Sequence, residues 1–269
     1  MKKRGARLGQ HFLTNTHYAD VLAKSVAVRE GETIVEIGPG KGALTQKLLA
    51  TGARVIAIEK DEALAEELHT TFASDVVAGK LTIVIGDVRD FTPSGAYVVA
   101  ANIPYYITGE IIKQFLTAEM QPRAMALLVQ KEVAERIIAR DKKESMLSLS
   151  VKVYGVPKIV AKVGRGNFSP PPSVDSAILL IEDITRDFFS DITERDFFKI
   201  VHAGFAAKRK MFGSNMTHLY DKEIVHRACG SVNIDPCIRA ERLTILDWKR
   251  FTTSITCLCR PSSSQCQPT

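Results

Sequence analysis

Residues 33–50 constrain the fold of this chain more than any other stretch. Thr33–Ile37 is a short apolar run typical of a strand, a loop with three glycines follows at residues 38–42, and residues 44–50 have helical periodicity. Glycines let the backbone of such a loop approach a ligand closely, and the helix start offers free N–H groups. This order predicts an α/β fold with a ligand at the carboxyl end of the strand.

The alternation of strand and helix continues to about residue 183. The expected strands are 33–37, 54–58, 81–85, 98–102, 124–130, 159–163 and 177–181. The expected helices are 17–28, 44–50, 61–72, 108–116 and 131–139. Residues 184–256 have helical periodicity and no convincing strand. The sequence therefore predicts a Rossmann-like sheet in domain 1–183, a small all-helical domain at 184–259 and a disordered tail at 260–269.

Acidic residues follow two of the expected strands. Glu59 ends the second strand about 20 residues after the glycine loop, where an acid is expected to bind a ribose diol. Asp87 follows the third strand and is placed to accept a hydrogen bond from an adenine amino group. Both predict a nucleoside-containing cofactor. Gly38, Gly40 and Ala43 also satisfy the dinucleotide fingerprint, so a dehydrogenase stays open as an alternative.

The fourth apolar run, Val98–Ala101, ends in Asn102-Ile103-Pro104-Tyr105. Proline stops a strand, so Asn102 is expected at the carboxyl end, where α/β proteins bind ligands. Its side-chain carbonyl and the backbone carbonyl of Ile103 could accept the two hydrogens of an exocyclic amine and draw the lone pair onto nitrogen. Tyr105 offers a face for base stacking. The alternative is an ordinary turn with a packed tyrosine.

Residues 164–175 form a loop with three consecutive prolines and are expected to be stiff. This loop could present Phe168 as the second face of a base sandwich. The alternative is a phenylalanine that fills a gap in the core beneath the loop.

Composition limits the class of protein. The 269 residues are 45% hydrophobic, enough for a full core, yet no stretch reaches membrane-spanning length and no signal peptide is visible. All five cysteines lie in the last quarter without zinc-site spacing, which predicts reduced thiols in the cytoplasm and no metal. A net charge of +6 fits a polyanionic partner.

Basic residues gather in the expected helical domain. They are candidate phosphate contacts for RNA, and the alternative is a solvated surface. The candidates are Lys208, Arg209, Lys210, Arg239 and Arg242.

Five segments occur in the order and spacing of one family. They are Gly9–Leu13, Val35–Gly40, Asn102–Tyr106, Phe168–Ser176 and Ile234–Glu241. Over residues 4 to 250 the chain resembles the ribosomal RNA adenine dimethyltransferases, most closely the bacterial small-subunit type. The resemblance implies a class I methyltransferase sheet and transfer of two methyl groups from S-adenosylmethionine to N6 of each of two adjacent adenosines. These adenosines lie in a hairpin loop near the 3′ end of 16S rRNA.

The resemblance also implies roles for individual residues. Asn102 meets both cofactor and target amine within the segment that continues through Ile103 and Pro104, and Tyr105 and Phe168 stack on the base. The implied cofactor-binding residues are Gln10, His11, Leu13, Gly38, Gly40, Glu59, Asp87, Val88 and Asn102. No general base or metal is expected, because the sulfonium is a strong electrophile and positioning carries most of the rate.

Two positions depart from the family pattern: His11 stands where asparagine is usual, and Gly213 where an arginine is expected. The partner implied is 16S rRNA within the immature small subunit, and a monomer is expected. Two alternatives remain open. One is the sister group that methylates large-subunit rRNA and confers macrolide-type resistance, and the other is a subunit-assembly factor without catalysis.

Overall fold

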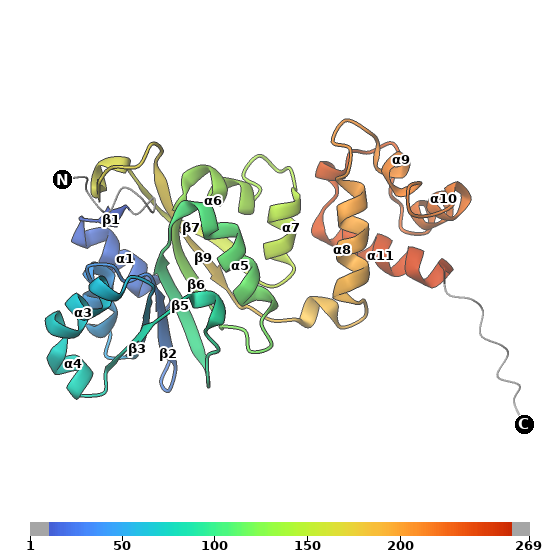
Figure 1. The fold of residues 1–269 in the computed structure, drawn as a ribbon. Helices are drawn as coiled ribbons and strands as arrows, with labels where there is room; N and C mark the ends of the chain where they lie inside the picture. Colours follow the sequence, from blue (N-terminus) through green and yellow to red (C-terminus); the bar gives the residue numbers. More distant parts are fainter. Residues whose placement is uncertain (1–10, 260–269) are drawn as a thin grey trace, which may run out of the picture. The chain divides into compact units, whose positions relative to one another are not determined.

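The computed structural model describes residues 11–259, so Gln10 and the expected tail at 260–269 lie outside the described residues (Figure 1). Its described residues form two compact units, 11–138 with 154–185, and 139–153 with 186–259. Residues 139–153 belong to the second unit. There the Glu144 N–H donates to the Glu241 carbonyl oxygen at 2.8 Å.

The first unit contains a seven-stranded sheet in the order β4-β3-β2-β5-β6-β9-β7. The first five strands in this order, from β4 through β3, β2 and β5 to β6, are parallel. β9 is antiparallel to both β6 and β7. Strand order reverses between β2 and β5, which opens a crevice at their carboxyl ends. The strands are β2 (Thr33–Ile37), β3 (Arg54–Glu59), β4 (Leu81–Ile85), β5 (Tyr97–Asn102), β6 (Met125–Gln130), β7 (Val156–Val163) and β9 (Ser176–Glu182).

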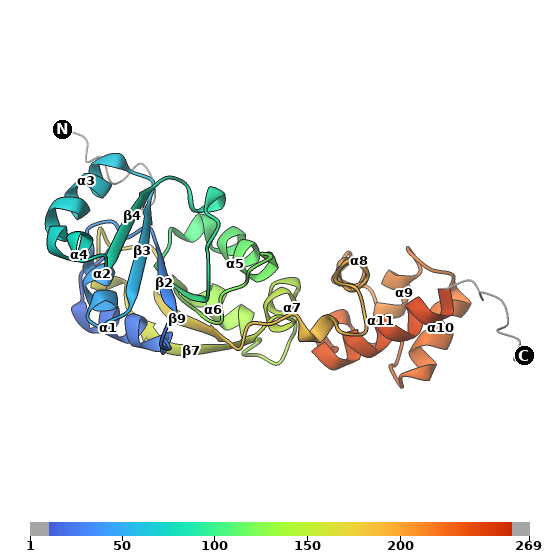
Figure 2. The same ribbon diagram turned by 90° about the horizontal axis from the view of Figure 1, so that it is seen from below.

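Helices cover both faces of this sheet (Figures 1 and 2). On one face lie α1 (Thr16–Ser25), α2 (Ala43–Leu49) and α3 (Glu62–Thr71), with α4 (Ala73–Val77) after them. On the other lie α5 (Thr108–Thr117) and α6 (Lys131–Ile137). Because helices cover both faces of the sheet, side chains on both sides of β5 are buried, which explains its continuous apolar run. Its Val98 lies in the core with Leu22 and Leu48, and its Tyr97 ring contacts Phe115 of α5.

A second, two-stranded sheet was not foreseen from the sequence. β1 (Phe12–Leu13) pairs antiparallel with β8 (Phe168–Ser169), so that Leu13 lies opposite Phe168. Both side chains are buried in the core of the first unit. The backbone N–H of Thr14 extends the pairing by donating to the Asn167 carbonyl oxygen at 2.9 Å. The segment after residue 10 is thereby fixed to the proline-rich loop.

The second unit is helical throughout its described residues, as expected. Its helices are α7 (Met146–Lys152), α8 (Glu194–Gly204), α9 (Phe212–Met216), α10 (Lys222–Ser231) and α11 (Ile245–Cys259). The buried Trp248 ring contacts Phe205 and Phe212 and lies against Gly204, the last residue of α8. No helix within residues 11–259 is long and apolar enough to cross a membrane.

Candidate functional site

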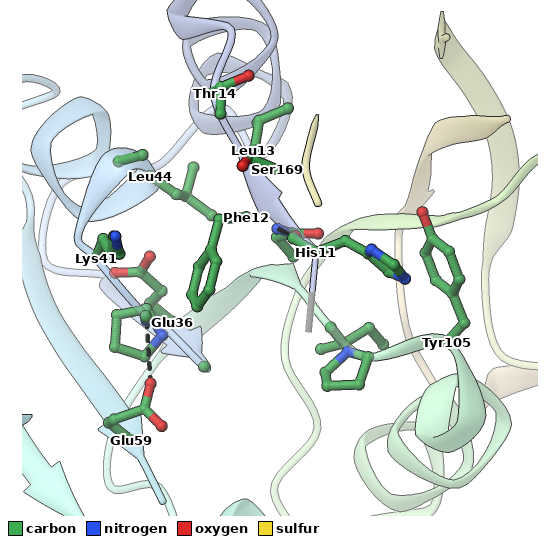
Figure 3. Close-up of a pocket in the computed structure, with 17 residues that line it drawn as sticks. His11, Phe12, Leu13, Thr14, Glu36, Lys41, Leu44, Glu59, Tyr105 and Ser169 are labelled. Atoms are coloured by element: carbon green, nitrogen blue, oxygen red, sulfur yellow. Dashed lines mark hydrogen bonds between the residues drawn. The ribbon is translucent and has the colours of Figure 1, made fainter. Parts of the chain in front are cut away.

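A cavity of about 410 Å³ lies at the carboxyl ends of β2, β3 and β5 in the first unit. This volume is in the range of small-molecule sites. Figure 3 shows its labelled side chains, with Glu36, Lys41 and Glu59 toward one end and His11 and Tyr105 toward the other. The lining residues are His11, Phe12, Leu13, Thr14, Glu36, Gly38, Pro39, Gly40, Lys41, Ala43, Leu44, Glu59, Asn102, Ile103, Pro104, Tyr105 and Ser169.

The glycine loop is fixed to the end of β3. The Gly38 N–H donates to the Ile58 carbonyl oxygen at 2.9 Å, and the Gly40 N–H donates to Oε2 of Glu59 at 3.0 Å. Gly40 has φ of +58°, and a Cβ atom there would lie 2.8 Å from the Phe12 ring. This position therefore needs glycine both for its left-handed backbone and for the close approach of Phe12.

Glu59 is held at the end of β3 by three backbone groups. Besides Gly40, the N–H groups of Lys60 and Asp61 donate to its Oε1 at 2.9 and 3.0 Å. The residue is only 3% exposed, yet it lines the cavity. A carboxylate has about four acceptor sites, so Glu59 keeps acceptor capacity toward a hydroxyl group in the cavity.

Glu36 is a lining residue that the sequence reading missed. It is 1% exposed, and its Oε2 accepts a hydrogen bond from Oγ1 of Thr45 in α2 at 2.7 Å. Oε1 is also buried and has no partner within the described chain. Burial raises the pKa of Glu36 to about 8. A single acid inside the otherwise apolar run Thr33–Ile37 was the available signal.

Asn102 lies at the end of β5, as predicted, and lines the cavity with Ile103 and Pro104. Its Nδ2 donates to the His11 backbone carbonyl oxygen at 3.0 Å. That bond orients the amide, and no described residue donates to its Oδ1. The side-chain carbonyl is thus available to a ligand.

Tyr105 begins a short 3₁₀ turn, η3 (Tyr105–Ile107), directly after Pro104. Its hydroxyl forms a 2.6 Å hydrogen bond with Oγ of Ser176, and burial raises the pKa of the phenol. The His11 imidazole stacks on its ring with centroids 5.8 Å apart and planes 30° apart. His11 Nδ1 lies 2.8 Å from the Pro170 carbonyl oxygen, so it carries the hydrogen.

Phe168 and Val88 were expected in the site but do not line the cavity. Phe168 is 4% exposed and packs in the core opposite Leu13, the arrangement that the sequence reading gave as its alternative. Val88 is buried, and its carbonyl oxygen accepts a hydrogen bond from Nε2 of Gln114 at 2.8 Å.

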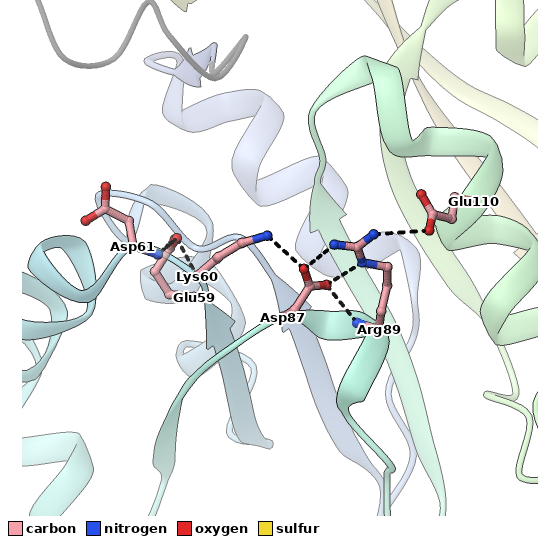
Figure 4. A network of polar contacts seen from close by, with 6 residues as sticks. All are labelled: Glu59, Lys60, Asp61, Asp87, Arg89 and Glu110. Atoms are coloured by element: carbon pink, nitrogen blue, oxygen red, sulfur yellow. Dashed lines mark hydrogen bonds and ion pairs between the residues drawn. The ribbon is translucent and has the colours of Figure 1, made fainter.

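Asp87 also lies outside the cavity lining and is bound by two cationic side chains (Figure 4). Arg89 donates through Nε to Oδ1 at 2.9 Å and through Nη2 to Oδ2 at 2.6 Å, and Lys60 Nζ lies 2.9 Å from Oδ2. The Arg89 guanidinium holds the pKa of this carboxyl far below its ordinary value. Arg89 is itself paired with Glu110 at 3.5 Å.

The basic candidates belong to the second unit, whereas the cavity is lined by residues of the first. The three residues 208–210 are exposed in the segment after α8. Arg239 donates through Nη1 to the Lys208 carbonyl oxygen at 3.2 Å, which brings two of the predicted cations together. Arg242 is exposed in the turn η6 (Ala240–Arg242). At Gly213, a Cβ atom would lie 3.0 Å from the Pro236 carbonyl oxygen, so an arginine does not fit there unchanged.

The parallel sheet, the glycine loop and the acid after β3 define a class I methyltransferase fold. Two solved structures share it, at identities that establish the fold alone. A 23S rRNA methyltransferase, ErmE, gives a TM-score of 0.76 at 22% identity, over 91% of this chain and 99% of that one. A dimethyladenosine transferase from Plasmodium falciparum gives 0.73 at 24% identity, over 90% and 96%.

The chain belongs to the ribosomal RNA adenine dimethylase family, whose model matches residues 1–256. It is 36% identical to a ribosomal RNA small subunit methyltransferase A of Dehalococcoides mccartyi, strain CBDB1, over 91% of this chain and 86% of the relative. A protein of the same name from Moorella thermoacetica is 37% identical, over 92% and 91%. The chain is therefore an rRNA adenine methyltransferase, and its cofactor is S-adenosylmethionine.

The cavity fits a nucleoside-containing cation. It combines a backbone loop that admits close approach, the acid Glu59 and the unpartnered oxygen of the buried Glu36. No cluster of three or more His, Cys, Asp or Glu side chains suited to a metal occurs within residues 11–259.

Proposed function

We propose that this protein transfers two methyl groups to N6 of each of two adjacent adenosines in the hairpin loop near the 3′ end of 16S rRNA. The proposed substrate is the immature small ribosomal subunit in the cytoplasm, and the proposed active form is a monomer. One observation carries the proposal: Asn102, Tyr105, the glycine loop and Glu59 come from separate parts of the chain yet line a single cavity. The names of the relatives support the small subunit over the large subunit as target.

The cofactor is proposed to lie between the glycine loop and the carboxyl end of β5. Gly38 and Gly40 would admit its methionine part, Glu59 would accept from its ribose, and the residues His11 and Leu13 would cover it. This placement of the cofactor is supported by the fact that all five of these residues line the cavity. When bound, S-adenosylmethionine supplies a methyl group on an electrophilic sulfonium.

Asn102 is proposed to prepare the target nitrogen. The hydrogen bond from its Nδ2 to the His11 carbonyl oxygen turns its Oδ1 toward a ligand. Oδ1 and the carbonyl oxygen of Ile103 would accept the two N6 hydrogens, which draws the nitrogen lone pair out of the adenine ring. Orientation of this kind contributes up to about 7–11 kcal/mol to barrier reduction in favourable intramolecular cases.

Tyr105 is proposed to stack on the target adenine, and Pro104 to keep the turn rigid beneath it. In this structure the His11 imidazole stacks on the Tyr105 ring and Phe168 is buried in the core, so a base that stacks on Tyr105 competes with His11. Stacking by Phe168 therefore requires the β1–β8 pair to move. Adenine recognition by Asp87 and Val88 likewise requires displacing a cation from Asp87.

The second unit is proposed to hold the rRNA through its exposed basic residues. Lys208 and Arg239 are linked by a hydrogen bond to the Lys208 backbone, which supports a shared phosphate-binding surface. Arg209, Lys210 and Arg242 would extend it.

The test is methyl transfer from labelled S-adenosylmethionine to small subunits that lack the modification, followed by nucleoside analysis. We expect N6,N6-dimethyladenosine, mapped to two adjacent positions, and little transfer to large-subunit rRNA. Binding to small subunits without any methylated adenosine would instead support the assembly-factor alternative. Preference for large-subunit rRNA would refute the proposed target.

A matched pair of substitutions tests the mechanism. Asn102→Ala is expected to retain subunit binding and lose at least about 100-fold in methyl transfer, because oriented polar groups of this kind contribute factors of about 10² to 10³. Tyr106→Ala is the control, since Tyr106 is 71% exposed and does not line the cavity. Normal methylation by Asn102→Ala would refute the proposed role.

A further inference from the structure

Glu36 is a buried acid that lies within the family segment Val35–Gly40 but has no role in the proposed transfer step. It is the fourth residue of β2, where the neighbouring strands place Ala57 and Ala100 opposite it. Glu36 itself lines the cavity. One carboxyl oxygen accepts from Thr45, and the other, Oε1, is buried without a partner.

The charges around this acid favour its neutral form. Glu59 from β3 lines the same cavity, and repulsion between the two carboxylates adds to desolvation in raising the pKa of Glu36 to about 8. Lys41 from the glycine loop is exposed, lies over the Phe12 ring and forms no ion pair with Glu36 in the described chain. His11 and Tyr105 are the other titratable groups in the lining. Near pH 7 these surroundings favour the protonated form of Glu36 as long as the cavity holds no cation.

Once Glu36 is ionised, Oε1 is a buried acceptor, and it then requires a donor from the ligand. S-adenosylmethionine carries two cationic groups, an ammonium and a sulfonium. The ammonium has three N–H donors, whereas the sulfonium has none. Only the ammonium can therefore both satisfy Oε1 and neutralise an ionised carboxylate.

We propose that Glu36 releases its proton when the cofactor binds and becomes the buried anion that pairs with the cofactor's ammonium group. This inference rests on the proposed placement of the cofactor in the cavity. Cofactor binding is then coupled to the release of one proton. Because the group must ionise on binding, affinity falls about tenfold for each pH unit below about 8 and levels off above it.

Isothermal titration calorimetry with S-adenosylhomocysteine tests the coupling directly. This ligand retains the ammonium group and lacks the sulfonium. At pH 7, titrations in phosphate and in Tris should differ in apparent enthalpy by an amount that corresponds to about one released proton. 5′-Methylthioadenosine, which lacks the amino-acid part, should bind without proton release.

Two variants separate Glu36 from general damage to the site. Glu36→Gln, a neutral isostere, should bind S-adenosylhomocysteine at pH 8.5 at least about tenfold more weakly than wild type and release no proton. Thr45→Val removes the hydroxyl that stabilises the carboxylate, so its affinity should level off at a higher pH. Circular dichroism establishes that both variants are folded.

The outcomes distinguish this inference from the proposed site. Tight binding with no buffer dependence in wild type would overturn the role of Glu36 and leave the cofactor site standing. Equal proton release by Glu36→Gln would also overturn it. Absence of any S-adenosylhomocysteine binding by the wild-type protein would count against the proposed cofactor site itself.

Discussion

The His11 imidazole stacks on the ring of Tyr105, the residue proposed to stack on the target adenine. Its backbone carbonyl has a separate task, because it accepts the hydrogen bond that orients Asn102. The departure from asparagine at this position thus affects access to Tyr105 more directly than it affects the Asn102 amide.

At this residue we predict that His11→Asn improves binding of the rRNA substrate. The substitution keeps the backbone carbonyl and removes a ring–ring contact of about 0.5–1.5 kcal/mol, so KM for small subunits should fall roughly 2- to 10-fold. Steady-state kinetics measures this change, and His17→Asn, at an exposed position in α1, is the matched control. A higher KM in His11→Asn, or an equal fall in the control, would contradict the prediction.

At the scale of elements, one arginine connects three parts of the first unit. Arg123 lies just before β6, and Glu32 lies just before β2. Arg123 donates through Nε and Nη2 to the Glu32 carboxylate at 2.6 and 2.8 Å. Its Nη2 also donates to the carbonyl oxygens of Val26 and Ala27 after α1, both at 3.1 Å. The sequence offered no sign of this connection, because residues 32 and 123 meet only through the parallel packing of β2, β5 and β6.

We predict that Arg123→Leu lowers the free energy of unfolding at pH 7 by about 1–3 kcal/mol, since Glu32 and two carbonyl groups lose their charged donor. Arg54→Leu, at an exposed position of β3, should change it by less than about 0.5 kcal/mol. Arg123 lowers the pKa of Glu32 below its ordinary value of 4.5. This contribution is therefore present above pH 4.5 and lost as the pH falls through the lowered pKa, so the difference from wild type in urea unfolding should shrink in acid.

At the scale of the whole molecule, the net charge of +6 and the exposed residues 208–210 predict salt-dependent binding of rRNA. Lys208→Ala with Lys210→Ala should weaken subunit binding and reduce the slope of log affinity against log salt by roughly 1 to 2. Filter binding at several salt concentrations measures the slope. Lys222→Ala with Arg227→Ala removes the same charge from α10, and an equal loss there would refute a localised contact.

Hydrophobic periodicity and turn residues determined the α/β class, the positions of the main strands and helices and the helical second unit. These features are local, because a strand or helix repeats its pattern over a few residues. The same locality placed Glu59 and Asn102 at strand ends, and Gly38 and Gly40 between strand and helix. Parallel strands then bring those ends to one edge of the sheet.

Only the tertiary structure determined which side chains lie at that edge of the sheet and which groups they contact. The pairing of β1 with β8 joins residues about 155 positions apart, buries Phe168 and places His11 over Tyr105. The ion pairs of Asp87 depend on Lys60 and Arg89 reaching the same carboxylate, and the raised pKa of Glu36 depends on its burial beside Glu59. Desolvation and long-range pairing arise from the folded surroundings of a residue, which its neighbours in sequence do not specify.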